Sequence, residues 1–293
     1  MPPQLINWLL LLFLVAVWGT SFLSTAIAIN GGLSPELITL FRILFGAMVL
    51  TIVVYLKGLR LPLTLKAWGC FLLLGFFGSA APFFLISWGQ QAMPSGLTGL
   101  LMSSMPLVTM LLAHYLVPDE PLNRYKIAGF LVAFSGVFIL LNPSSAASPD
   151  IWSAIAILTA SSCYALNTIL IRMLPTFNPL IAGAGMLLCA LMMFAPLPLA
   201  QGIGAISLQL QQANLDAILA VIWTGLIPTG IASIVYFIVV ERAGPSFLSN
   251  CNFLIPVVAV FAGALILGES ITLTGIGALV IILSGIGLTR FRA

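Results

Sequence analysis

The feature that most constrains this chain is a succession of long apolar runs joined by short polar connections. Each run is continuous and about 20 residues long, which is the length that an α-helix needs to cross about 30 Å of hydrocarbon. Strands of a membrane barrel would instead be about ten residues long and would alternate in polarity. The pattern therefore predicts an all-α integral membrane protein with ten transmembrane helices, at residues 5–29, 35–56, 67–90, 95–117, 124–141, 151–172, 179–200, 216–240, 246–267 and 271–289.

The composition favours the same class. Of the 293 residues, 61% are hydrophobic and 6% are charged, whereas a soluble domain carries about 25% charged residues. Because so few charges cannot cover a water-facing surface, most of the surface should face a lipid bilayer. The formal net charge is +3, and no basic run interleaved with aromatic residues lies outside the apolar segments. We therefore expect no nucleic-acid partner.

Sequence motifs of enzymes and metal sites are missing. The chain has no HExxH, GxSxG or CxxC pattern and no paired carboxylates within an apolar run. Its one histidine, His114, lies near the predicted end of the fourth span, where an interfacial or packing role is expected. The four cysteines lie in or beside apolar runs and are interpreted as small packing residues. We expect no enzymatic activity, no metal and no cofactor.

Positive charge is distributed unevenly between the connections. Nine of the ten Lys and Arg residues follow an even-numbered predicted span: Lys57, Arg60, Lys66, Arg124, Lys126, Arg172, Arg242, Arg290 and Arg292. The opposite connections carry only acidic charges, at Glu36, Asp150, Asp216 and Glu269. By the positive-inside rule this pattern predicts that both termini are cytoplasmic.

The two halves of the chain repeat each other at an offset of about 150 residues. Corresponding positions include Trp18 and Tyr164, Ser34-Pro35 and Asn178-Pro179, Pro94-Ser95 and Pro245-Ser246, Pro106 and Pro256, and Glu120 and Glu269. Because each unit holds five predicted spans, the second unit must insert upside down relative to the first, which is an inverted repeat. The predicted boundaries are 1–142 for the first repeat, 143–150 for a linker and 151–293 for the second repeat.

Several of these residues carry a family resemblance that covers nearly the whole chain. They are Trp18-Gly19, Phe41-Arg42, the Ala-x-Pro sequences at 92–94 and 243–245, the prolines within spans, and Gly268-Glu269. With the paired five-helix units, they make the chain resemble the EamA-type branch of the drug/metabolite transporter superfamily, and the YddG-like aromatic amino-acid exporters in particular. The first unit departs from the pattern with Asp119-Glu120, and the second has Met186 where the first has Arg42. The resemblance implies a multi-pass transporter that exports a small solute across a bacterial inner (plasma) membrane.

The positions of the acidic residues bear on whether transport is coupled to a proton or ion gradient. All seven carboxylates lie at span ends or in connections, whereas a carboxylate at mid-bilayer would mark a proton or ion relay. Small multidrug transporters of the same superfamily carry a glutamate in their first helix, and the stretch 15–21 has no acid here. This favours facilitated export down a gradient over proton-coupled extrusion of cations.

Arg42 is the only charge well inside a predicted span. In a functional interpretation, Arg42 binds a substrate carboxylate or another anion. In a structural interpretation, its guanidinium donates to backbone carbonyls at a helix interface or reaches towards the outer headgroups. The second, structural interpretation is favoured, because only one half carries the arginine and no acid lies at the same depth.

In an inverted-repeat transporter the solute site is expected near the midplane, where the halves meet. Aromatic and small polar residues gather there, with Ser233 and Phe253 at the same depth. Ordinary aromatic packing and interhelical hydrogen bonding are the structural alternatives for such residues. The candidate substrate-binding residues are Trp18, Ser21, Ser79, Phe83, Met102, Ser103, Tyr164, Asn167, Thr229 and Asn252.

Proline and glycine patterns predict which helices bend and which pack closely. Each in-span proline removes a backbone donor, so Pro82, Pro106, Pro228 and Pro256 are candidate gating hinges, with static kinks as the alternative. The fifth and tenth spans carry Gly129, Gly136, Gly277 and Gly285, which suits closely packed scaffold helices. The connection 201–216 has isolated apolar residues and could lie along the membrane surface.

Together these features predict a transporter that works by alternating access through a central cavity. The expected substrate is a small uncharged or zwitterionic metabolite, with amino acids, aromatic ones included, first. The protein is expected to be a monomer or a weak homo-oligomer. One alternative is a transporter of drugs, or of nucleotide sugars or organophosphates. Phosphate-bearing solutes would need two or more cationic side chains in the cavity. The other alternative is a non-transporting membrane scaffold.

Overall fold

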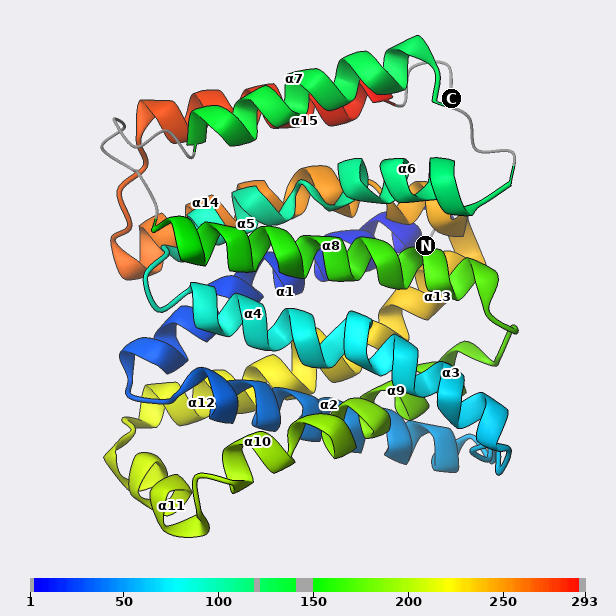
Figure 1. Cartoon of the computed structure of the whole chain (residues 1–293), viewed down its shortest axis with the longest axis vertical. Helices are drawn as coiled ribbons and strands as arrows, with labels where there is room; N and C mark the ends of the chain where they lie inside the picture. The colour runs from blue at the N-terminus through cyan, green and yellow to red at the C-terminus, as the bar shows by residue number, and fades with distance from the viewer. Residues whose placement is uncertain (1–2, 119–121, 141–149, 290–293) are drawn as a thin grey trace.

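The computed structural model describes residues 3–118, 122–140 and 150–289, and among these residues all regular structure is helical (Figure 1). Most of the predicted linker, Asp119-Glu120 and the two C-terminal arginines lie outside the described residues. The elements are α1 (Pro3–Asn30), α2 (Pro35–Leu56), α3 (Leu65–Gly75), η1 (Phe76–Ala80), α4 (Ala81–Gly89), α5 (Ser95–Met102), α6 (Met105–Leu116), α7 (Arg124–Leu140), α8 (Ile151–Met173), α9 (Pro179–Phe194), α10 (Pro196–Leu199), α11 (Ile203–Gln212), α12 (Leu215–Thr224), η2 (Gly225–Ile231), α13 (Ala232–Leu248), α14 (Cys251–Leu267) and α15 (Leu273–Thr289).

Helix lengths bear on how many segments can cross a bilayer. Among the described residues, seven helical stretches are long and apolar enough to do so, and α14 and α15 are shorter apolar helices. With α7, these two helices have 17 residues each, about 25 Å at 1.5 Å per residue, which is less than the thickness of the hydrocarbon core. The all-helical class is therefore confirmed, while ten spans in two inverted repeats stay a prediction.

Two helix starts show how local sequence positions the elements. The side chain of Ser34 accepts a hydrogen bond from the backbone N–H of Leu37, and Pro35 follows in the first turn of α2. At the corresponding place in the second half, Asn178 accepts from the N–H of Leu180 ahead of α9. Such caps satisfy backbone donors that have no partner within the helix.

The two ends of the bundle differ in charge. Helix α1 begins, α15 ends and the α2–α3 connection lies at one end, whereas α10 and α11 lie at the other (Figure 1). At the first end, Arg242 Nε donates to Asn7 Oδ1 at 3.1 Å and joins α13 to α1. The acidic residues Asp150 and Asp216 begin helices at the opposite end. Basic connections of the sequence thus lie at one end of the fold, and acidic helix starts lie at the other.

The predicted surface connection 201–216 contains a helix, α11. Ile206 and Leu210 pack against a cluster of buried residues from α1, α2 and α12. Ile203 and Leu208 are 78% and 54% exposed. The helix therefore rests on the end of the bundle and leaves a second set of apolar side chains outward.

Helices α7 and α15 form a closely packed antiparallel pair at one edge of the bundle (Figure 1). A Cβ at Gly129 would lie 2.5 Å from the carbonyl oxygen of Gly285, and one at Gly136 would lie 2.8 Å from Ile282. The contacts run in opposite order along the two helices, which makes the pair antiparallel. A Cβ added at Gly277 would meet no atom within 4 Å outside its own helix backbone, so this glycine takes no part in the close packing. Backbones approach this closely only where small residues meet.

Packing between the halves follows a mirrored scheme. The first helix of the first half, α1, packs against α12, α13 and α14, which are late helices of the second half. The first helix of the second half, α8, packs against α4, α5 and α6 of the first half. The halves are therefore interlocked and do not form separate bundles.

Several predicted spans are interrupted. The span predicted at 67–90 contains the π-helical turn η1, and the one at 216–240 contains η2. The span at 95–117 breaks between α5 and α6, at Ser103-Ser104. Near the predicted ninth span, Gly244 has φ 82° and α14 begins only at Cys251. Hydropathy averages over such breaks, so the pattern predicted the spans as continuous helices.

Candidate functional site

The interior of the bundle holds a buried arginine where the two halves meet. Arg42, on α2, is 7% exposed, and its Nε donates to Thr229 Oγ1 of η2 at 3.1 Å. The guanidinium carbon lies 3.8 Å from the ring centroid of Phe83 on α4. The Tyr164 ring of α8 meets the same phenylalanine edge-on, at 6.5 Å between centroids. Two segments of each half therefore contribute to this cluster, which we call the Arg42 cluster (Arg42, Phe83, Tyr164 and Thr229).

Local backbone geometry presents Thr229 to α2. The residue lies in the π-helical turn η2, and its hydroxyl donates to the carbonyl of Thr224 at 3.0 Å. A Cβ at Gly46 would lie 2.6 Å from Thr229 Cγ2, so the glycine leaves room for the threonine. The π turn shifts the register of the helix by one residue and redirects this side chain.

The electrostatics of the Arg42 cluster are unbalanced. No described residue forms an ion pair with Arg42, and its partners there are the Thr229 hydroxyl and the Phe83 ring. A charged residue at the centre of a membrane helix costs about 2.5–3.5 kcal/mol on insertion scales. The cation–π contact and the hydrogen bond to a neutral acceptor stabilise the guanidinium, but neither neutralises its charge.

Trp18 was predicted to line the site together with Tyr164. Its Nε1 donates to the carbonyl oxygen of Pro228 at 3.0 Å and so joins α1 to η2. Tyr164 shows no hydrogen bond from its hydroxyl among the described residues. Of this corresponding pair, the tryptophan is thus hydrogen-bonded to the protein, and the tyrosine hydroxyl has no hydrogen-bond partner in the described part of the chain.

The other predicted binding residues divide by whether their polar atoms are satisfied. The hydroxyls of Ser21 and Ser103 donate to carbonyls of their own helices. Ser79 Oγ and Asn167 Oδ1 are buried and have no partner among the described residues. The Asn167 amide lies against Gly78 in η1, the residue before Ser79. Unsatisfied groups therefore gather where η1 meets α8.

Met102 and Asn252 complete the predicted set. Met102 ends α5 and packs, partly buried, against the core cluster that includes Phe22 and Leu101. Asn252 lies half-buried in the first turn of α14, with Phe253 beside it. Neither is a member of the Arg42 cluster.

The four predicted hinge prolines lie in different settings. Pro82 is in the first turn of α4, directly after η1, and Pro228 lies inside η2. Pro106 begins α6, directly after the break in that span. Pro256 lies inside α14, which continues through it. Three of the four therefore coincide with a departure from regular α-helix.

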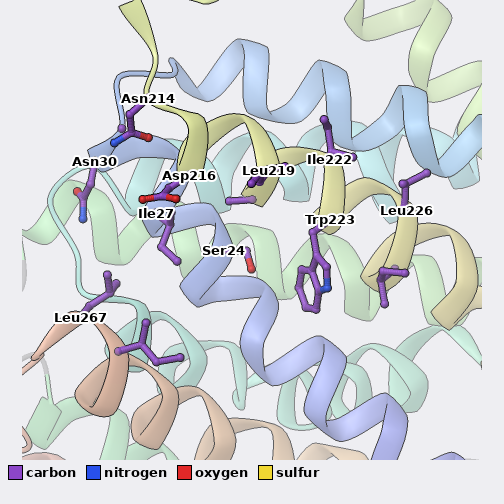
Figure 2. A pocket seen from close by; sticks show the side chains of 14 residues that line it. Ser24, Ile27, Asn30, Asn214, Asp216, Leu219, Ile222, Trp223, Leu226 and Leu267 are labelled. Carbon is purple, nitrogen blue, oxygen red and sulfur yellow. The ribbon is translucent and has the colours of Figure 1, made fainter.

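A pocket of about 810 Å³ opens near the end of the bundle where α1 ends and α12 begins (Figure 2). Asn30, Asn214 and Asp216 gather at one end of it, and Ser24 and Trp223 lie along its apolar side. None of the ten predicted substrate-binding residues lines this pocket. No sequence pattern predicts this pocket, because its walls come from α1, α12, η2 and α14, which only tertiary packing brings together.

Glu269 has a structural role that motif reasoning did not predict. Its two carboxylate oxygens accept hydrogen bonds from the backbone N–H groups of Ser95 and Gly96, at 2.7 and 2.9 Å. The carboxylate thereby caps the N-terminus of α5, where the helix dipole favours negative charge. Since Glu269 follows α14, this cap joins the second half to the first.

Comparison with known proteins gives the chain a family context. The profile of the EamA-like transporter family matches residues 6–142 and again residues 151–291. The uncharacterized transporter YoaV of Bacillus subtilis is 23% identical, over 94% of this chain and 93% of its own. An uncharacterized protein of Pseudomonas aeruginosa is 30% identical, over 98% and 95%.

Two further similarities concern function and fold. A probable amino-acid metabolite efflux pump of Salmonella typhimurium is 25% identical, over 96% of this chain and 94% of its own. One solved crystal structure matches with a TM-score of 0.69 and 18% identity, covering 98% of this chain and 99% of that one. At that identity the structural likeness shows the fold alone.

Proposed function

Because the chain belongs to the EamA-like transporter family, we propose that it exports small uncharged or zwitterionic metabolites across a bacterial inner membrane. Amino acids, aromatic ones included, are the leading substrates. In this proposal ten transmembrane helices form two inverted five-helix repeats, both termini are cytoplasmic, and the solute passes through a central cavity by alternating access. The protein acts as a monomer or a weak homo-oligomer.

The single observation that carries the proposal is the mirrored packing of two halves that each match the family profile. Helices α1 and α8, the first of each half, run in opposite directions (Figure 1). Helices α7 and α15, the last of each half, are antiparallel, with Gly129 against Gly285. Inverted repeats of this kind place a solute site between the halves. Rocking one half against the other opens that site alternately to the two sides of the membrane.

The conformational change would use the irregular turns. Segments η1 and η2 occupy corresponding places in the two halves, and Pro82 and Pro228 lie beside or inside them. The hydrogen bonds of a π turn are weaker and a proline removes one more donor, so bending is easiest there. Opening at one end would then accompany closing at the other.

The character of the interior supports an amino-acid-like solute. Phe83 and Tyr164 supply aromatic surface, and Ser79 and Asn167 supply polar atoms that no described residue satisfies. Resemblance to YddG-like exporters and similarity to a probable amino-acid metabolite efflux pump support the same class. An organophosphate would want more than one buried cation, and among the described residues only Arg42 is a buried Lys or Arg.

Reconstitution tests the proposal. The purified protein in liposomes is expected to move labelled neutral amino acids, aromatic ones included, at a rate that does not follow an imposed proton gradient. Movement of drugs or sugars but not of any amino acid would refute the substrate class. Flux that tracks the proton gradient would refute the facilitator mechanism.

Substitution tests the site itself. Trp18→Ala and Tyr164→Ala are expected to reduce amino-acid flux at least about tenfold, as expected for aromatic side chains at a solute site. Size-exclusion chromatography of both variants should show a folded protein. Unchanged transport by a variant would remove that residue from the solute site.

A further inference from the structure

We infer that Arg42 binds the carboxylate of the transported solute. This inference rests on the proposed transport function and narrows it to solutes that carry a carboxylate. It starts from the position of the side chain, which is buried where the two halves meet and forms no ion pair with any described residue. A buried cation that no described residue neutralises points to an anion supplied from outside.

The donors of the guanidinium that remain free have the right arrangement. Arginine has five N–H donors in a planar fork, and among the described residues only the one at Nε has an acceptor, the Thr229 hydroxyl. The terminal nitrogens do not appear among the fully buried polar atoms that lack a partner. Among the described residues these terminal N–H groups, which form one edge of the guanidinium, therefore have no acceptor, and two parallel N–H groups suit both oxygens of one carboxylate.

The neighbours of Arg42 hold this edge in place. The Phe83 ring supports one face of the guanidinium at 3.8 Å, and Thr229 fixes its Nε side. Thr39, one helical turn earlier on α2, is fully buried and its hydroxyl has no partner among the described residues. Tyr164 packs edge-on against Phe83 and adds aromatic surface. A solute with a carboxylate and an apolar or aromatic side chain matches these groups.

A purely structural role would need different contacts. An arginine with a purely structural role would have its donors satisfied by the protein, whereas Arg42 donates to the Thr229 hydroxyl and to no backbone carbonyl in the described part of the chain. In addition, the second half has Met186 at the aligned position, half-buried on α9. The repeat therefore folds around this position without a charge, and the arginine of the first half is free to serve binding.

The wild-type protein alone provides the first test. In proteoliposomes we expect uptake of a labelled neutral amino acid to be inhibited by unlabelled amino acid and by a monocarboxylate of the same side chain. The corresponding carboxamide should inhibit at least about tenfold less well, because it lacks the charge that pairs with the guanidinium. Equal inhibition by acid and amide would overturn the inference.

Variants provide the second test. Arg42→Met copies the residue of the second half and should abolish the preference for the acid over the amide. Arg42→Lys keeps the charge but not the paired donors and should retain only part of the preference. Arg60→Met makes the same change at an exposed residue in the α2–α3 connection and serves as the matched control. An unchanged preference in Arg42→Met would overturn the inference.

The outcomes separate this inference from the proposed function. Amino-acid flux that keeps its acid preference in Arg42→Met would leave the proposed function standing and refute the role of Arg42. If monocarboxylates move in an Arg42-dependent way and amino acids do not, the role of Arg42 is supported and the amino-acid proposal fails.

Discussion

The two halves of this protein share a backbone plan but differ in the side chains placed on it. Each half has a π-helical turn in its third long segment, η1 at Phe76–Ala80 and η2 at Gly225–Ile231, with a proline beside or inside it. Each half also packs its first helix against the later helices of the other. The points where the backbone can bend are therefore duplicated.

The chemistry is not duplicated. Arg42 in the first half has Met186 as its counterpart in the second. Trp18 donates to the Pro228 carbonyl, whereas the hydroxyl of its counterpart Tyr164 has no partner in the described residues. In the proposed function, the duplicated backbone plan would serve the motion of the protein, while binding would depend on residues that only one half carries.

The largest expected effect concerns the antiparallel pair that links the ends of the two halves. Gly129→Leu should destabilise the protein by about 2–3 kcal/mol, because its side chain would meet the Gly285 backbone. Gly277→Leu makes the same change where an added Cβ would meet no atom within 4 Å, and it should have little effect. Thermal unfolding in detergent measures both, and equal destabilisation would contradict the close packing.

A smaller effect is expected at the cap that joins the second half to the first. Glu269→Ala removes the acceptor of the Ser95 and Gly96 N–H groups and should cost about 1–2 kcal/mol. Glu241→Ala removes an exposed carboxylate from α13 as the matched control. If the two variants unfold at the same temperature, Glu269 is not a significant cap.

The smallest effect distinguishes Trp18 from Tyr164. Trp18→Phe loses the hydrogen bond to Pro228 and should lower stability by about 1 kcal/mol. Tyr164→Phe loses a hydroxyl without a partner among the described residues and should leave stability unchanged. Unfolding curves of the two variants compare them directly. A greater loss in Tyr164→Phe would reverse the asymmetry.

Much of the fold could be predicted from hydropathy and local signals. Helix starts at Pro35 and Pro179 follow from their capping residues, and Pro82, Pro106 and Pro228 mark real departures from α-helix. The prediction that each span is one continuous helix was wrong, because a π turn or a break such as Ser103-Ser104 leaves the apolar pattern intact.

The site could be predicted only in part. Phe83, Tyr164 and Thr229 are candidates by their depth and their aromatic or polar character, and Arg42 is expected to be structural because only one half carries it and no acid lies at the same depth. Their convergence depends on contacts between residues up to 187 positions apart. The cap by Glu269 joins residues 174 positions apart. Tertiary packing decides such contacts, and no local pattern records them.

The central claim is that the halves insert in opposite orientations, and cysteine labelling tests it most directly. Arg60→Cys and Gln201→Cys place exposed thiols after the second helix of each half, and the four native cysteines are buried. In intact cells, a membrane-impermeant maleimide should label position 201 and spare position 60, with the reverse in inside-out vesicles. Labelling of both positions from the same side would contradict the account.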